Sequence, residues 1–179
     1  MSQFADFAEN KLVDMIRGQS WSLGTSLYMG LASAAADGSI TELSGTSYGR
    51  VAVSRALASW AGTQAPGSVT ASTGTLHATS NNAIINWGTS GSAWGTANYV
   101  TVHDAATAGN VVCYLPLAVA LVIGSGVPVT VAAGALSFTL GPTGGCSDYL
   151  ANALIDFIDR KSTRLNSSHI QKSRMPSSA

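Results

Sequence analysis

The stretch from Trp94 to Leu115 reads WGTANYVTVHDAATAGNVVCYL, and it decides how the rest of the chain is interpreted. Val100 and Val102 alternate with other residues, which is the period of a half-buried β-strand. The run Val111 to Leu115 is apolar on both faces, and Ala108-Gly109-Asn110 before it is rich in turn formers. Two strands joined by a turn are therefore predicted here.

Runs with the same period of two extend outward from this stretch, and turn residues separate them. Their alternating apolar positions are Leu27, Met29, Leu31, Val51, Val53, Ala83, Ile85, Trp87, Val127, Val129, Val131, Leu136, Phe138 and Leu140. Between the runs the chain shows no helical crossovers, which disfavours a parallel α/β sheet. About seven to nine short strands predict an all-β fold, an antiparallel β-sandwich or jelly-roll-like domain over residues 21–141.

The segment 1–20 precedes this domain and has helical periodicity instead. Ser2 can cap the helix and Gly18 can end it. A single apolar stripe must dock either on the protein's own sheet or on a neighbouring subunit. We predict a short amphipathic helix whose subunit interface comprises Phe4, Phe7, Leu12, Met15 and Ile16.

Length and composition limit the classes of protein to consider. The chain has 179 residues, of which 46% are apolar, and this suffices for one domain with a core. The longest apolar run, Val111 to Ile123, is interrupted by Pro116 and is too short to span a membrane. Cys113 and Cys146 do not make a disulfide framework. With no signal peptide recognisable, we expect a soluble protein made in a reducing cytoplasm.

Charge is distributed unevenly along the chain. Residues 1–158 contain four basic and eight acidic side chains, whereas residues 159–179 contain five basic side chains and one acidic one. The segment 159–179 resembles the translation of a sequencing-library adapter. We expect it to be disordered and give its basic residues no functional weight. No nucleic-acid partner is therefore predicted.

An internal repeat follows the predicted sheet domain. Residues 147–158 align with residues 5–16 at a constant offset, with identities at the positions of Asp6, Asn10, Leu12, Asp14 and Ile16. Residues 142–158 are interpreted as a linker and the opening helix of a second copy of the domain, which indicates a tandem array. The alternative is a coincidental pair of amphipathic helices flanking one domain.

Two short sequences could suggest catalysis. The pentapeptide from Gly45 to Gly49 matches G-x-S-x-G, but a strand rather than a helix is expected after Ser47. His103 and Asp104 are adjacent in a strand and should point to opposite faces, so we expect His103 on the polar face and Asp104 in the following turn. His77 stands alone. We predict that the protein is not an enzyme and has no cofactor and no metal site.

Aromatic and basic residues give weaker predictions. Trp87 continues an alternating apolar set and is expected in the core. We predict that Trp60, Trp94 and Tyr99 are exposed and form a binding surface, for example one that stacks on sugars. Arg50 and Arg55 flank one strand, either as solvated edge charges or in interface ion pairs.

The order of several segments resembles a known family. These segments are DFAENKLVDMIR, TSLYMGL, SYGRVAV, IINW, SAWGTANYVTVHDAATAGNVV and VAAGALSFTL, and the resemblance that they carry extends over nearly all of positions 4–158. They are similar to tailed-bacteriophage structural proteins described as tail or tail-fibre components. The resemblance implies a non-enzymatic virion protein assembled in the host cytoplasm, which binds other virion proteins and forms homo-oligomers. Binding of a host-surface glycan is the alternative function.

Overall fold

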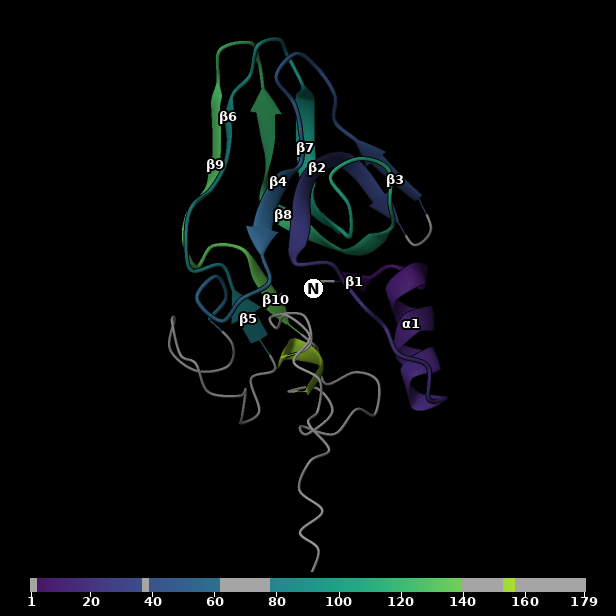
Figure 1. Cartoon of the computed structure of the whole chain (residues 1–179). Helices are drawn as coiled ribbons and strands as arrows, with labels where there is room; N and C mark the ends of the chain where they lie inside the picture. Colours follow the sequence, from purple (N-terminus) through teal and green to yellow (C-terminus); the bar gives the residue numbers. More distant parts are fainter. Residues whose placement is uncertain (1–2, 37–38, 62–77, 140–152, 157–179) are drawn as a thin grey trace, which may run out of the picture.

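The computed structural model describes residues 3–36, 39–61, 78–139 and 153–156 (Figure 1). These residues form antiparallel β-sheets, with a helix close to the N-terminus and a helical turn at residues 153–156. The predicted all-β class with a short N-terminal helix is therefore confirmed. Leu140 and His77, which the sequence analysis considered, lie outside the described residues.

The predicted pair of strands lies at the centre of the largest sheet. β7 (Gly95–His103) pairs with β8 (Val111–Ile123) on one side and with β2 (Ser26–Ala36) on the other. The six-stranded sheet has the order β1-β8-β7-β2-β3, and β4 also pairs with β2. The remaining bounds are Gln3–Phe4 for β1, Ser39–Glu42 for β3 and Val51–Ser54 for β4.

Two smaller sheets complete the described strands. β5 (Ala78–Ser80) pairs with β10 (Ser137–Thr139), and β6 (Ile85–Thr89) pairs with β9 (Pro128–Val131). In Figure 1 the β6–β9 pair is at the upper left and the β5–β10 pair lies below it. Ala83 was predicted to belong to an alternating strand run, but it is exposed and lies before β6, so this prediction is wrong.

Alternation along the strands divides the side chains between two faces of the large sheet. Paired residues of antiparallel strands lie on the same side. Met29 pairs with Val102 and both are buried in the core, whereas Gly30 pairs with Thr101 on the opposite face. Four tryptophans also contribute their indole rings to this core. Trp87 comes from β6, and Trp21, Trp60 and Trp94 come from segments outside the strands. Trp87 is thus in the core, as predicted.

The N-terminal helix, α1 (Asp6–Ile16), begins later than the sequence pattern predicts. Phe4 is not helical, because it belongs to β1 and lies opposite Cys113 of β8. The N-cap residue is Ala5, without a side-chain cap, so the predicted capping by Ser2 is wrong. Gly18 follows the helix with a φ of 87°, a left-handed conformation that suits glycine after a helix end.

The second half of β8 is irregular and exposed. Ala97 of β7 pairs with Leu121 and Tyr99 pairs with Pro116, so residues 117–120 of β8 lie opposite Asn98 alone. This β-bulge pushes Val119 outward, and its side chain is 81% exposed. Among the described helices, none has the length and apolar character needed to cross a membrane.

Candidate functional site

A polar cluster occupies the face of the large sheet opposite the core, and Arg50 is at its centre. The guanidinium group of Arg50 holds the Glu42 carboxylate with two bonds, Nε to Oε1 at 2.9 Å and Nη2 to Oε2 at 2.7 Å. Its Nη1 donates to the carbonyl oxygens of Ala105 and Ala108, at 2.9 and 2.6 Å. Arg50 therefore ties β3 to the turn between β7 and β8.

Tyr48 connects the same cluster to β2. Its hydroxyl group donates to Glu42 Oε1 at 2.9 Å and accepts a bond of 2.9 Å from the backbone N–H of Leu31. Burial alone would raise the pKa of the Glu42 carboxyl group, but the hydrogen bonds from Arg50 and Tyr48 outweigh burial and the pKa is lowered. Glu42 is consequently held as a carboxylate.

His103 lies beneath this ion pair and is only 2% exposed. Its Nε2 is 2.9 Å from Thr101 Oγ1, and its Nδ1 has no hydrogen-bond partner within the described part of the chain. Burial lowers the pKa of His103 to about 4, and the Arg50 charge acts in the same direction. His103 lies on the polar face opposite Val102, as predicted, and it is buried there because the ion pair and the turn cover this face of the sheet.

Gly30 makes room for the cluster in the middle of β2. A Cβ atom at this position would lie 2.7 Å from Thr101 Oγ1 and 2.9 Å from Glu42 Oε1. Both distances are shorter than real Cβ contacts, so a side chain here would displace the polar groups. The glycine therefore has a packing role rather than a turn role.

The turn between β7 and β8 is closed by Asp104. Its Oδ1 accepts the backbone N–H of Asn110 at 2.7 Å, and its Oδ2 accepts the Asn110 side-chain amide at 2.8 Å. Ala108 and Gly109 have φ angles of 52° and 69°, within the left-handed region. The predicted turn role of Asp104 is confirmed, and its carboxylate is bonded to Asn110.

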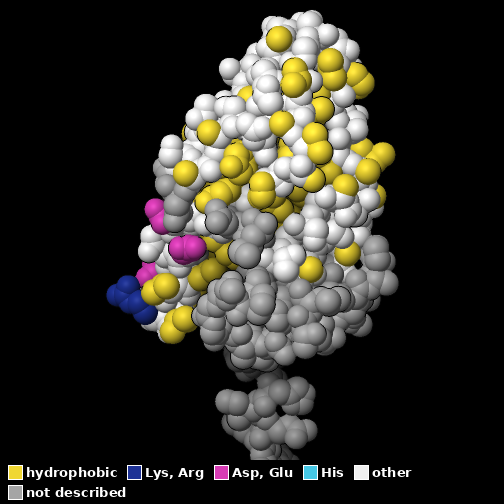
Figure 2. All heavy atoms as spheres, turned by 180° about the vertical axis from the view of Figure 1, so that it is seen from behind, with side chains coloured by type: hydrophobic (Ala, Val, Ile, Leu, Met, Phe, Trp, Pro, Cys, Tyr) yellow, Lys and Arg dark blue, Asp and Glu magenta, His cyan; other side chains and the backbone are white. Residues whose placement is uncertain are grey.

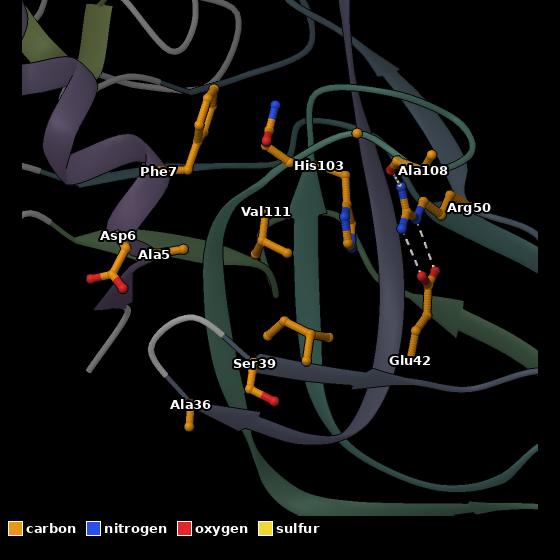
Figure 3. Close-up of a pocket in the computed structure, with 13 residues that line it drawn as sticks. Ala5, Asp6, Phe7, Ala36, Ser39, Glu42, Arg50, His103, Ala108 and Val111 are labelled. Carbon is orange, nitrogen blue, oxygen red and sulfur yellow. Dashed lines mark hydrogen bonds and ion pairs between the residues drawn. The ribbon is translucent and has the colours of Figure 1, made fainter.

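A cavity of about 500 Å³ lies next to the polar cluster. Figure 3 shows Asp6 and Phe7 of α1 on one side, Glu42 and Arg50 on the other, and His103 between them. Pockets of this size accept small molecules when a few polar groups converge on an otherwise apolar lining. The other lining residues are Ala5, Ala36, Ser39, Ile40, Ala108, Gly109, Asn110 and Val111.

The predicted tryptophan surface is not formed. Trp60 is 0% exposed, donates its indole N–H to the Ser54 carbonyl oxygen and packs against Phe138. Trp94 is likewise buried and donates to the Thr46 carbonyl oxygen. Their surface role is therefore corrected to a core role. Tyr99 is half-buried against Tyr114.

The two arginines also differ from their predicted surroundings. Arg50 forms an internal ion pair rather than an edge or interface pair. Arg55 is buried and donates through Nη1 to the carbonyl oxygens of Leu23 and Gly24, both at 2.9 Å. Each guanidinium group thus serves to hold loops of its own chain.

Four of the five predicted helix-interface residues contact the protein's own core. Phe4, Phe7, Leu12 and Met15 are partly buried there, so α1 docks on its own domain. Ile16 is largely exposed. The exposed apolar side of α1 consists of Ile16 and Val13, a residue that the periodicity did not single out.

The surroundings of Ser47 do not match those of a catalytic serine, and the described side chains were also searched for a metal site. β4 follows Ser47, whereas a nucleophile elbow requires a helix at this point. In the described ranges, no group of three or more His, Cys, Asp or Glu side chains could hold a metal ion. The polar groups of the cluster instead hold turns and strands together.

The module is rich in strands, and its buried charged side chains hold loops of the same chain in place. These features are typical of a structural protein. A comparison with family models gives the particular family: residues 3–139 match the family described as Podophage GP4 fiber I protein gp80, and the chain belongs to this family. The resemblance to tailed-phage tail-fibre proteins is confirmed. The protein has a structural role in a tail fibre and is a virion component. No curated protein matches the chain.

Proposed function

We propose that the protein is a non-enzymatic fibre module that acts through contacts with other copies of itself and with other virion proteins. The observation that supports this is the exposure of large apolar side chains at two places. They are Val13 and Ile16 on α1, and Val119, Leu121 and Val122 on β8. Groups of exposed large apolar side chains are typical of protein interfaces.

The surroundings of β8 favour an apolar partner. No charged residue occurs in the sequence from position 105 to position 147. Figure 2 shows hydrophobic side chains and no charged ones over the upper part of the face it displays, the end at which β6 and β9 lie in Figure 1. Two copies of an uncharged surface can pack together without opposing like charges.

Sedimentation velocity of the full chain over a range of concentrations tests this proposal. The wild type is expected to self-associate, and Val119→Asp should reduce the association because a buried charge is costly. Thr41→Asp places the same charge on an exposed position of β3, at the edge of the large sheet away from β8, and serves as the control. Equal masses for wild type and Val119→Asp would count against an interface at β8.

A carbohydrate- or host-surface-binding module is the second candidate, and the cavity beside His103 is the observation that favours it. Ile40 lines this cavity, whereas its neighbour Thr41 is exposed on the other side of β3. If the cavity binds a glycan, Ile40→Trp should abolish a signal on a glycan array and Thr41→Trp should retain it. An array on which the wild type binds nothing would oppose this candidate.

A further inference from the structure

The exposed part of β8 is a protrusion that is anchored at both ends. Residues 117–120 lie opposite Asn98 alone, so the chain leaves the ladder with β7 there and returns to it at Leu121. Leu117 at one end is half-buried against the core, and Ile123 just beyond the other end is 1% exposed. The sheet and the core therefore hold the protrusion in place.

The side chains of this protrusion are all apolar. Its sequence from Leu117 to Val122 is LAVALV, and every side chain after Leu117 is exposed. Among the described strands, β1 is the outer neighbour of β8 and pairs with it only at Cys113 and Tyr114, so the protrusion lies at an open edge. Exposed edges usually carry charged side chains that oppose association, and this one carries none. These features indicate an apolar partner.

Charge distinguishes the β8 protrusion from the exposed apolar side of α1. Charged side chains accompany Val13 and Ile16 along the helix and directly after it, namely Asp6, Glu9, Lys11, Asp14 and Arg17. In Figure 2 the charged side chains lie at the lower left, and the upper part of this face has none. Packing β8 against α1 would take charges out of water, which is costly unless they are paired. A second β8 protrusion is an uncharged partner.

We propose that residues 117–122 of β8 pack against the same residues of a second copy of the chain, so that Val119 of one copy lies beside Val119 of the other. This inference rests on the proposed role of subunit contacts and specifies which surfaces meet. A contact between identical surfaces requires that each surface complement itself. An uncharged apolar protrusion meets this condition, because no like charges are brought together.

Cross-linking of full-chain variants with one added cysteine tests which surfaces meet. A short bifunctional maleimide should convert Val119→Cys to a covalent dimer several-fold more than Thr41→Cys, whose thiol is exposed on β3 at the opposite edge of the sheet. A maleimide is preferred because a direct disulfide requires Cα atoms within about 7 Å. Every variant also carries Cys146→Ser, and the remaining natural thiol, Cys113, is buried. The chain with Cys146→Ser alone gives the background.

A mixture of Val119→Cys chains and tagged Val13→Cys chains distinguishes a contact between unlike surfaces. Mixed dimers in preference to Val119→Cys pairs would overturn the inference, and so would a dimer yield no higher than that of Thr41→Cys. Thermal unfolding establishes that each variant is folded. If Val119→Cys does not fold, Val122→Cys places the thiol on the same protrusion, at a position that is 71% exposed, and should give the same result.

The proposed β8 interface and this inference can fail separately. If Val119→Asp reduces self-association but Val119→Cys is not cross-linked, β8 contacts a different surface, and only the inference fails. If Val119→Asp leaves self-association unchanged, the β8 interface fails and the inference fails with it.

Discussion

The two faces of the six-stranded sheet are made from alternate residues of the same strands, yet they are stabilised in different ways. On the core face, Met29 and Val102 pack among other apolar side chains, and area removed from water is the main source of stability. On the opposite face, Thr101 and His103 lie beneath the Arg50 and Glu42 ion pair. There the stability depends on directional bonds.

This difference shows what each face contributes. Apolar packing tolerates exchanges of similar volume, so the core face specifies the layer arrangement without fixing single atoms. The polar face fixes the position of a loop, because Arg50 and Tyr48 join β3, β2 and the β7–β8 turn. A buried polar group that loses its partner is costly, so changes on this face should have consequences out of proportion to their size.

The largest expected effect belongs to the core. Trp60→Ala removes a fully buried indole that packs on Phe138, and large-to-small changes of this type cost about 4 kcal/mol of unfolding free energy. Chemical denaturation measures the change. Tyr99→Ala, at a half-buried position, should cost clearly less. A loss below about 1 kcal/mol for Trp60→Ala would indicate an exposed side chain and contradict the core assignment.

The second-largest loss of unfolding free energy is expected when the ion pair on the polar face is broken. Arg50→Met leaves the Glu42 carboxylate in a partly buried site without its cation, and we expect a loss of about 3 kcal/mol. Combining Arg50→Met with Glu42→Leu removes the unpaired charge and should recover part of this loss. Denaturant midpoints of the single and double variants give the comparison. Equal losses in both would show that the pair contributes through packing alone.

The strands of the core face could be predicted because their signal is local. Leu27, Met29 and Leu31 alternate within five residues, and the turn around Gly109 separates two apolar runs. The burial of Trp60 could not be predicted in this way. It depends on Phe138, which lies far along the chain, whereas its own neighbours have loop character.

The polar face was harder to predict for the same physical reason. Glu42 is eight residues from Arg50, but the carbonyl oxygens of Ala105 and Ala108 are more than fifty residues away. Alternation correctly placed His103 opposite Val102, but it could not reveal that another segment covers that face. A glycine in the middle of an apolar strand, Gly30, was the available signal for close packing there.

Acid should weaken the polar face before the core face. His103 has a pKa of about 4 when folded and near 6.5 when unfolded, so the unfolded chain binds the extra proton between these values. Its contribution is complete above pH 6.5 and is lost as the pH falls to 4, by roughly 2 to 3 kcal/mol. The lowered pKa of Glu42 extends the loss to more acidic pH.

Unfolding free energies of wild type and His103→Gln between about pH 2.5 and pH 7.5 measure this dependence. The variant should have a shallower slope between pH 4 and pH 6.5 and should keep the loss at lower pH that Glu42 causes. Identical slopes in the two proteins would show that His103 is accessible to protons in the folded state. Such a result would remove His103 from the buried cluster.

The smallest expected effect concerns the turn that the polar face holds. Asp104→Ala removes two acceptors for Asn110, and because these bonds are exposed to water the loss should be about 1 kcal/mol. Asp104→Asn retains one oxygen that can accept the Asn110 N–H and should lose less. Since Arg50 holds the carbonyl oxygens of the same turn, Asp104→Ala should cost more in Arg50→Met than in the wild type. Strictly additive losses in denaturation experiments would mean that Arg50 and Asp104 position the turn independently.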